Sequence, residues 1–155
     1  MEVYRITQEK YAADLTGNGA RLFGGRWNSE GYYALYTAST RALALLETLA
    51  HTPMQMLKEK KYKVVTITIP NNASTETIHL KKLKTDWDAW DLLYYTQKMG
   101  NLFLQNKERL LLEVPSVLVH EEMNYIINPL HPLMREIKIT FERDLKFNDR
   151  LLKTV

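Results

Sequence analysis

Residues 16–31 read Thr-Gly-Asn-Gly-Ala-Arg-Leu-Phe-Gly-Gly-Arg-Trp-Asn-Ser-Glu-Gly and hold five of the six glycines in the chain. Glycine permits backbone conformations and close approaches that other residues do not. This concentration predicts a long, shaped loop. Loops of that length in a compact domain are usually functional or disordered, and the presence of Arg26 and Trp27 argues against disorder. We therefore expect a functional loop here.

Regular elements are expected beyond this loop. Residues 32–37 are rich in strand formers. Ser39 or Thr40 is placed to cap a helix over Arg41–His51, which Pro53 would end. Further helices are expected at 87–93 and 96–108, and strands at 63–69, 109–114, 117–120 and 137–141. Because these elements intermix without a βαβα rhythm, we expect one α+β domain over residues 1–155.

Composition excludes several classes of protein. Of the 155 residues, 45% are apolar and 25% charged, which is typical of a globular domain. The absence of cysteine excludes disulfides, a thiolate nucleophile and cysteine-ligated metals. The start of the chain lacks the features of a signal peptide, and no apolar run is long enough to cross a bilayer. We expect a cytoplasmic protein with no membrane contact, and no metal because the histidines lack ligand spacing.

The net charge of +3 comes from the part of the chain beyond residue 50, partly from lysine runs at 58–63 and 81–84. Such runs are most often solvated. A nucleic-acid interface would instead interleave arginines and aromatics on one face. Nucleic-acid binding is therefore a minor hypothesis.

Glu47 lies in the expected helix with Leu43, Ala44, Ala50 and His51 as its surface neighbours three and four residues away. Three of these four are apolar, and an unpaired charge beside an apolar stripe is costly. Two interpretations stay open. Glu47 is either a boundary residue that pairs with His51 on the surface, or a carboxylate held in a pocket with a tuned proton affinity.

Arg26 follows two glycines, so its guanidinium can grip a phosphate or carboxylate, or can simply stack on Trp27 in solvent. The segment is neither a Walker loop nor a dinucleotide-binding fingerprint. Ser116 lacks the Gly-x-Ser-x-Gly setting of a serine nucleophile, and most such serines satisfy nearby backbone groups. Asn124 and Asn128 are interpreted as turn formers.

Taken in order, these segments resemble the RES domain, a family named for its arginine, glutamate and serine. The resemblance begins at Tyr4-Arg5, runs to about residue 151 and so covers nearly the whole chain. The matching segments are residues 17–20, 24–28, 36–37, 42–47, 114–116, 122–132 and 147–151.

The resemblance implies a fold like that of ADP-ribosyltransferase toxins, with small mixed or antiparallel sheets flanked by helices. It implies the toxin half of a bacterial type II toxin–antitoxin pair. The implied partner is an Xre-type helix-turn-helix antitoxin, which would make any DNA contact itself. Members of the family cleave the nicotinamide–ribose bond of NAD+ as hydrolases or phosphorylases, and some ADP-ribosylate a protein.

Carried over residue by residue, the motif positions are Arg26, Glu47 and Ser116, and Arg5 and Tyr36 match two further pocket residues. On this basis Glu47 would stabilise the charge that develops on the ribose. Arg5 and Arg26 would hold the pyrophosphate, and Tyr36 would orient the nicotinamide or ribose. Ser116 would bind the ribose or position the acceptor. NAD+ is the substrate, and no cofactor is expected; a phosphorylase would also need inorganic phosphate.

Other readings stay open at this point. The runner-up is a mono-ADP-ribosyltransferase that modifies a host protein. A different class is an inactive partner-binding domain. Another is an RNA-cleaving toxin, for which the lysine runs and His51 or His120 are the candidates. We also expect a homodimer inside a larger toxin–antitoxin complex.

Overall fold

The computed structural model describes residues 1–153, whose strands form one seven-stranded sheet in the order β4-β5-β6-β2-β1-β3-β7. Neighbouring strands pair antiparallel except β4 and β5, which are parallel. The strands are β1 (Glu2–Gln8), β2 (Leu35–Ala38), β3 (Tyr62–Thr68), β4 (Thr75–Thr77), β5 (Leu111–Pro115), β6 (Met123–Ile127) and β7 (Lys138–Leu145).

Four α-helices and five short 3-10 segments join these strands in the described part of the chain. The α-helices are α1 (Asn18–Phe23), α2 (Arg41–His51), α3 (Met54–Glu59) and α4 (Leu93–Asn106). The 3-10 segments are η1 (Glu9–Tyr11), η2 (Leu80–Lys82), η3 (Trp90–Leu92), η4 (Pro132–Glu136) and η5 (Asp149–Leu152).

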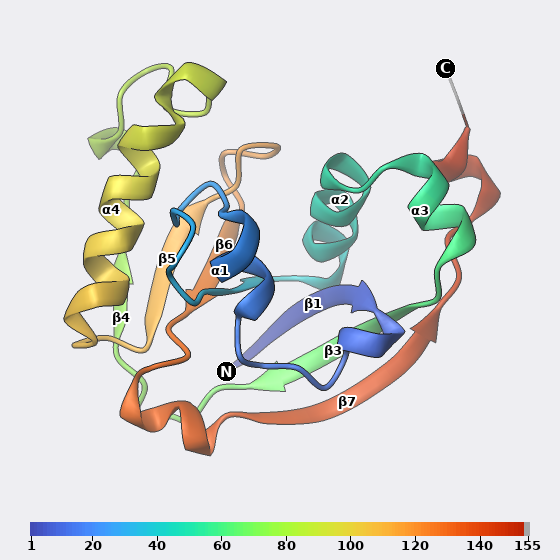
Figure 1. The fold of residues 1–155 in the computed structure, drawn as a ribbon, viewed down its shortest axis with the longest axis horizontal. Coiled ribbons are helices and arrows are strands. Elements are labelled where there is room, and N and C mark those ends of the chain that lie inside the picture. The colour runs from blue at the N-terminus through green and yellow to red at the C-terminus, as the bar shows by residue number, and fades with distance from the viewer. Residues whose placement is uncertain (154–155) are drawn as a thin grey trace.

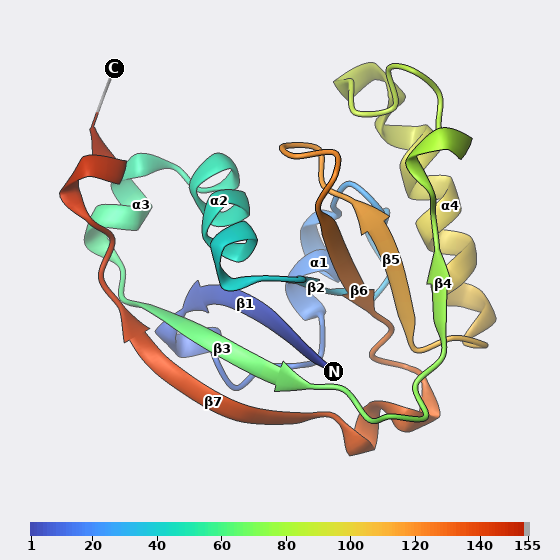
Figure 2. The ribbon, with the colours of Figure 1, turned by 180° about the vertical axis from the view of Figure 1, so that it is seen from behind.

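The sheet bends strongly, so that its two halves face different ways (Figure 1). In one half β1, β3 and β7 run together, and in the other β4, β5 and β6 stand across them, as the reverse view also shows (Figure 2). Helix α2 lies by β1, and α4 runs alongside β4 and β5. The α+β class is confirmed, and the expected small sheets are the two halves of one continuous sheet.

Strand β5 is buried on both faces because consecutive side chains of a strand point in opposite directions. Leu111 belongs to an apolar core with Val65 and Ile67, whereas Leu112 belongs to a second core with Trp87 and Phe103. The central strands therefore join two apolar cores, one on each side of the sheet.

The helix expected at Arg41–His51 is confirmed with its bounds. Its cap is Thr40, whose Oγ1 accepts a 3.0 Å hydrogen bond from the Leu43 amide. The strands expected at 63–69 and 137–141 correspond to β3 and to the first part of β7, and the helix expected at 96–108 lies mostly within α4.

Some expectations were wrong. Residues 117–120 form a turn, because the Ser116 hydroxyl accepts hydrogen bonds from the amides of Leu118 and Val119. The helix expected at 87–93 is largely non-helical before η3. Strands β1, β4 and β6 and helices α1 and α3 were not anticipated. Asn124 therefore lies within β6 and is not a turn former, whereas Asn128 does accept from the Leu130 amide in a turn.

The glycine-rich segment contains the short helix α1 between two glycines, Gly17 and Gly24, that both have positive φ. A side chain at Gly17 would also meet the backbone of Ala34 at 2.7 Å. The start of this segment is thus packed against Ala34, the residue directly before β2. Across residues 1–153, every helix is too short or too polar to span a membrane.

Candidate active site

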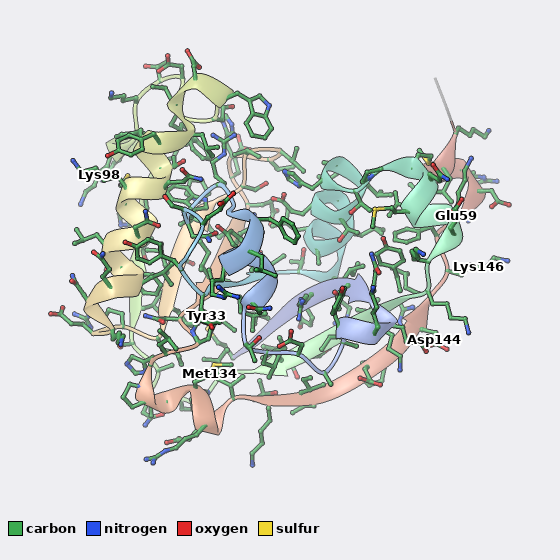
Figure 3. The ribbon with its side chains drawn as sticks, viewed as in Figure 1. Tyr33, Glu59, Lys98, Met134, Asp144 and Lys146 are labelled. Atoms are coloured by element: carbon green, nitrogen blue, oxygen red, sulfur yellow. The ribbon has the colours of Figure 1, made fainter. Side chains whose placement is uncertain are left out.

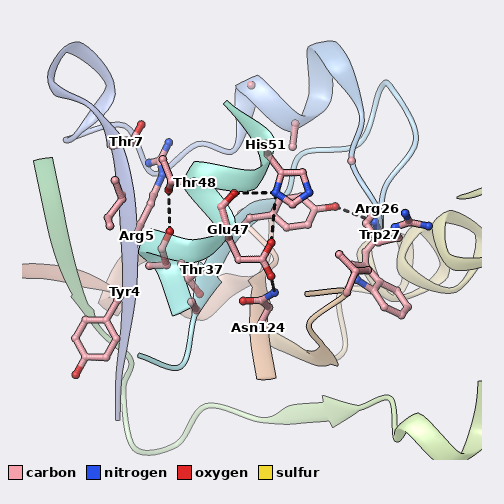
Figure 4. A pocket seen from close by; sticks show the side chains of 18 of the residues that line it. Tyr4, Arg5, Thr7, Arg26, Trp27, Thr37, Glu47, Thr48, His51 and Asn124 are labelled. Carbon is pink, nitrogen blue, oxygen red and sulfur yellow. Dashed lines mark hydrogen bonds and ion pairs between the residues drawn. The ribbon is translucent and has the colours of Figure 1, made fainter. Parts of the chain in front are cut away.

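A cavity of about 450 Å³ opens where the two halves of the sheet meet α2 and the glycine-rich segment. Cavities of this size are typical of small-molecule sites. Its lining includes four of the five residues that the sequence singled out, Arg5, Arg26, Tyr36 and Glu47, together with His51 and Asn124 (Figure 4).

Glu47 projects from the second turn of α2 into this cavity, and 20% of its side chain remains exposed. Its Oε1 accepts hydrogen bonds from Asn124 Nδ2 at 2.6 Å and from Ser116 Oγ at 2.8 Å. Its Oε2 lies 3.4 Å from His51 Nδ1. Both interpretations of Glu47 are therefore partly right, because it neighbours His51 and also faces the pocket. Hydrogen bonds to a carboxylate are stronger than neutral ones, and here they fix its orientation.

Ser116 is fully buried directly after β5, and its neighbours Pro115 and Val117 line the cavity in its place. Its one hydroxyl proton goes to Glu47, and its oxygen accepts from the amides of Leu118 and Val119. A hydroxyl has one donor and two acceptor positions, so this one is fully used. Ser116 therefore contacts the Glu47 carboxylate and does not itself line the cavity, and its role toward the substrate stays a prediction.

Arg26 reaches the cavity from the glycine-rich segment. Its Nη2 donates to the carbonyl of Asp88 at 2.9 Å and its Nη1 to that of Ala89 at 3.2 Å. Its guanidinium carbon lies 5.5 Å from the centre of the Trp90 ring. Burial lowers the pKa of Arg26, and the nearby Asp88 carboxylate opposes this shift. An arginine stays cationic at any physiological pH, so the cavity has a fixed positive charge here.

Arg5 supplies a second cation from β1. Its Nη1 donates to the Asp14 carbonyl at 2.7 Å. Burial lowers the pKa of Arg5, whereas the negative charge of Asp14 raises it. In Figure 4 Arg5 and Arg26 lie on opposite sides of Glu47. The two arginines thus share one cavity but do not form a single cluster.

Tyr36 connects β2 to the glycine-rich segment. Its hydroxyl donates to Asn28 Oδ1 at 2.7 Å and accepts from the Trp27 amide at 3.0 Å. Burial raises the pKa of Tyr36 well above its usual range, although the Trp27 hydrogen bond and the charge of Arg26 oppose the shift. Because the hydroxyl is engaged, the ring is the part of Tyr36 available to a ligand.

Sequence reasoning missed Asn124 as a site residue. Asn124 pairs with Ala38 of β2 and Val114 of β5 across the sheet, so its side chain shares their face at the strand end nearest α2. The available signal was the run Met-Asn-Tyr-Ile-Ile at 123–127, whose strand formers place Asn124 on the same face as Ile126.

Of the candidates for an RNA-cleaving toxin, His51 lines the cavity, whereas His120 and the lysine runs do not. His120 pairs with Asp88, at 3.2 Å from its carboxylate. Among the described residues that line the cavity there is no lysine, so the lysine runs lie outside it. Across residues 1–153 we find no group of histidine, aspartate and glutamate side chains arranged to hold a metal ion.

The fold and the site together define an α+β protein with a carboxylate between two arginines in an open cavity. Residues 2–148 match the family model of the RES domain, and the chain belongs to this family. It is 39% identical over 144 residues to a protein of Sphingobium sp. strain YBL2 named Prs ADP-ribosylating toxin, covering 92% of this chain and 89% of that one.

A second relative, from Photorhabdus laumondii, is named Toxin Res and is 33% identical over 155 residues, covering 99% of this chain and 98% of that one. Among solved structures, a chain of the M. tuberculosis MbcT–MbcA toxin–antitoxin complex superposes with a TM-score of 0.77. That match covers 94% of this chain and 84% of the other at 21% identity, and it supports the fold.

Proposed function

We propose that this protein is the toxin of a toxin–antitoxin pair and that it cleaves the nicotinamide–ribose bond of NAD+. The observation that carries the proposal is the Glu47 carboxylate, held at Oε1 by Ser116 and Asn124 in a cavity with an arginine on either side. Relatives across nearly the full length are named as toxins, and one of them as ADP-ribosylating.

In the proposed reaction the C1′–N bond breaks, and its electron pair goes to the nicotinamide nitrogen, which becomes neutral. Positive charge then develops on the ribose, as in glycoside cleavage. Because both hydrogen bonds from Ser116 and Asn124 fall on Oε1, we assign Oε2, whose neighbour is His51 Nδ1 at 3.4 Å, to the ribose. A carboxylate oriented before the reaction and shielded from water stabilises this charge more strongly than one in bulk solvent.

The remaining pocket residues bind and orient the substrate. Arg26 pairs with the diphosphate through the three of its five N–H groups that do not bond the carbonyls of Asp88 and Ala89, and glycines beside it allow close approach. Arg5 adds a positive charge on the other side of Glu47, which attracts the anionic substrate. The ring of Tyr36 packs against the nicotinamide or ribose and limits its rotation.

The acceptor of the ADP-ribosyl group completes the reaction. Attack on C1′ by water gives ADP-ribose, and attack by inorganic phosphate gives its phosphorylated form. A second candidate function, mono-ADP-ribosylation of a protein, is favoured by the name of the Sphingobium relative. All three share the bond-breaking step, so Glu47 would be needed in each.

The partner belongs to the same proposal. We expect an Xre-type helix-turn-helix antitoxin that closes the mouth of the cavity and makes the DNA contact, with this chain as a homodimer in the complex. The arginines of the cavity would attract an acidic segment of the antitoxin. Co-expression of the two proteins, followed by light scattering of the purified complex, measures whether they associate and in what ratio.

The test of NAD+ cleavage is turnover by purified protein with and without phosphate, resolving nicotinamide, ADP-ribose and phosphorylated ADP-ribose. Glu47→Gln keeps the shape of the side chain and removes its charge, so we expect at least a hundredfold loss, as for other preorganised charge-stabilising groups. Glu59→Gln is the matched control, because Glu59 lies exposed on α3, away from the cavity (Figure 3).

Full nicotinamide release by Glu47→Gln would contradict the proposed role of this residue. The transferase alternative is tested with NAD+ labelled in its adenylate half, incubated with bacterial extract. Label that remains on a protein, and is lost with Glu47→Gln, would favour the transferase over the hydrolase and the phosphorylase.

A further inference from the structure

Trp90 has the most exposed indole of the three tryptophans. Its side chain is 78% accessible, whereas Trp27 and Trp87 are 3% and 1% accessible. Large aromatic side chains are seldom left so exposed without a contact to make. Resting on the proposed function, we propose that Trp90 is the platform on which the adenine ring of NAD+ stacks.

The position of Trp90 follows from Arg26. The guanidinium of Arg26 donates to the carbonyls of Asp88 and Ala89, the two residues directly before Trp90, and lies 5.5 Å from the centre of the indole ring. Arg26 lines the cavity, and Trp90 does not. The indole therefore lies beside a lining residue but outside the lining itself, and we infer that it stands at the rim of the cavity, next to the cation that we assign to the diphosphate.

The order of the chemical groups in NAD+ determines which of them lies beside Trp90 at the rim of the cavity. The nicotinamide ribose must lie at Glu47 for its bond to break, and the diphosphate follows it at Arg26. The adenosine half comes next along the molecule, so it leaves the cavity past Arg26. Among the described residues, the aromatic ring that makes a cation–π contact with Arg26 is that of Trp90.

The indole of Trp90 and the guanidinium of Arg26 together have the chemistry that binds a nucleotide. A base stacks on an exposed aromatic face through its own π-face, and an adjacent guanidinium neutralises the phosphates of the same ligand. The hydrogen bonds of Arg26 hold its guanidinium beside the indole before any ligand arrives. The indole and the guanidinium together form one preorganised subsite for the adenosine diphosphate part of the substrate.

The test compares two substrates that share the reacting bond. Nicotinamide mononucleotide has the nicotinamide ribose and one phosphate but no adenosine. For Trp90→Ala we expect KM for NAD+ to rise about five- to hundredfold, the range of one base–aromatic stack, with kcat unchanged. For nicotinamide mononucleotide, kcat/KM stays the same. Trp90→Phe, which keeps an aromatic face, restores most of the affinity for NAD+.

The matched control is Tyr11→Ala. Tyr11 is also an exposed aromatic beside a cation, with Lys10 Nζ 4.7 Å from its ring centre, and it does not line the cavity. We expect it to change neither substrate's kinetics. Equal losses on both substrates for Trp90→Ala would show that Trp90 acts only through Arg26, and an unchanged KM for NAD+ would show that adenine does not touch it. Either result overturns the proposal.

A binding measurement that needs no catalysis tests the role of Trp90 separately from the proposed NAD+ cleavage. Calorimetry of ADP-ribose binding should show the same five- to hundredfold loss of affinity for Trp90→Ala, even if the wild-type protein cleaves no NAD+. Absence of cleavage with this loss would contradict the proposed function alone. Equal affinity of wild type and Trp90→Ala for ADP-ribose would contradict the role of Trp90.

Discussion

The hydroxyl of Ser116 donates a 2.8 Å hydrogen bond to Oε1 of Glu47, 69 positions away in the chain. Ser116 is completely buried, and its hydroxyl holds the turn at 117–119 at the same time. The serine of the arginine–glutamate–serine motif therefore links the Glu47 carboxylate to the end of β5, and we expect it to act as a positioning residue.

Ser116→Ala should lower kcat for NAD+ by about ten- to hundredfold, because a hydrogen bond to a charged group is worth about 1.5–3 kcal/mol. The loss should be smaller than that of Glu47→Gln. The double variant should lose little more than Glu47→Gln alone, because Ser116 acts through Glu47. Single-turnover kinetics of the four proteins measure this, and additive losses would mean that the serine has an independent role.

Asn124→Asp should be more harmful than Asn124→Ala at neutral pH. It places a second carboxylate where the amide now lies 2.6 Å from Glu47 Oε1, and two such groups share a proton. The proton is released only at higher pH, so the pH profile of kcat should move upward in Asn124→Asp. A profile with wild-type midpoints would show that the two side chains do not interact in solution.

Tyr36→Phe separates the ring of Tyr36 from its hydroxyl. Loss of the hydroxyl leaves Asn28 Oδ1 and the Trp27 amide without their partner, so the free energy of unfolding should fall by about 1–3 kcal/mol. The retained ring should keep kcat for bound substrate close to that of the wild type. Urea denaturation gives the first quantity and saturation kinetics the second. A large fall in kcat with unchanged stability would assign the hydroxyl a chemical role.

Gly100→Ala should destabilise the fold and displace the glycine-rich segment at Arg26 and Trp27, since a methyl group at position 100 would overlap the carbonyl oxygen of Trp27. Crowding of this kind typically costs about 1–3 kcal/mol or more. Gly19→Ala is the control for stability, because nothing lies within 4 Å of its added carbon and alanine favours the helix α1. Equal free energies of unfolding in the two variants would show that α4 does not pack this closely on Trp27.

Tyr125 should lose its proton at a higher pH than an ordinary tyrosine, of which the chain has nine in all. Burial raises its pKa to about 12, and the hydrogen bond and negative charge of Glu113 add to the shift. The pKa of Tyr125 is therefore higher in the folded protein than the ordinary tyrosine value of about 10. The stability that comes from keeping this hydroxyl protonated is present below pH 10 and is lost as the pH rises toward 12. Absorbance titration of tyrosinate should lose one late component in Tyr125→Phe. The same late component in the variant would contradict this.

Local sequence patterns predicted the elements whose signals are local. The helix Arg41–His51 has its cap, apolar stripe and terminating proline within a few residues, and its bounds agree with the structure. Strand β3 alternates clearly and was also found. By contrast, β6 was missed because two asparagines at positions 124 and 128 suggested turns, and only the second makes one.

The contrast between local and long-range signals also explains which parts of the candidate site could be predicted from the sequence. Glu47 and Arg26 could be selected because charges stand out beside an apolar stripe or between glycines. The sequence left two interpretations of Glu47 open, since its partners Ser116 and Asn124 are not local to it. The turn at 117–120 was mistaken for a strand for a related reason, because a single buried hydroxyl decides its conformation.

The sequence by itself determined the family, the α+β class and the residue types at the motif positions, because these depend on composition, short periodicities and motif order. Only the tertiary structure decided what Glu47 faces, because its partners come from 69 and 77 positions away and meet it through the pairing of β2, β5 and β6. The same holds for Arg26, whose carbonyl partners are 62 and 63 positions distant. Such contacts arise from strand register and packing, which no local pattern encodes.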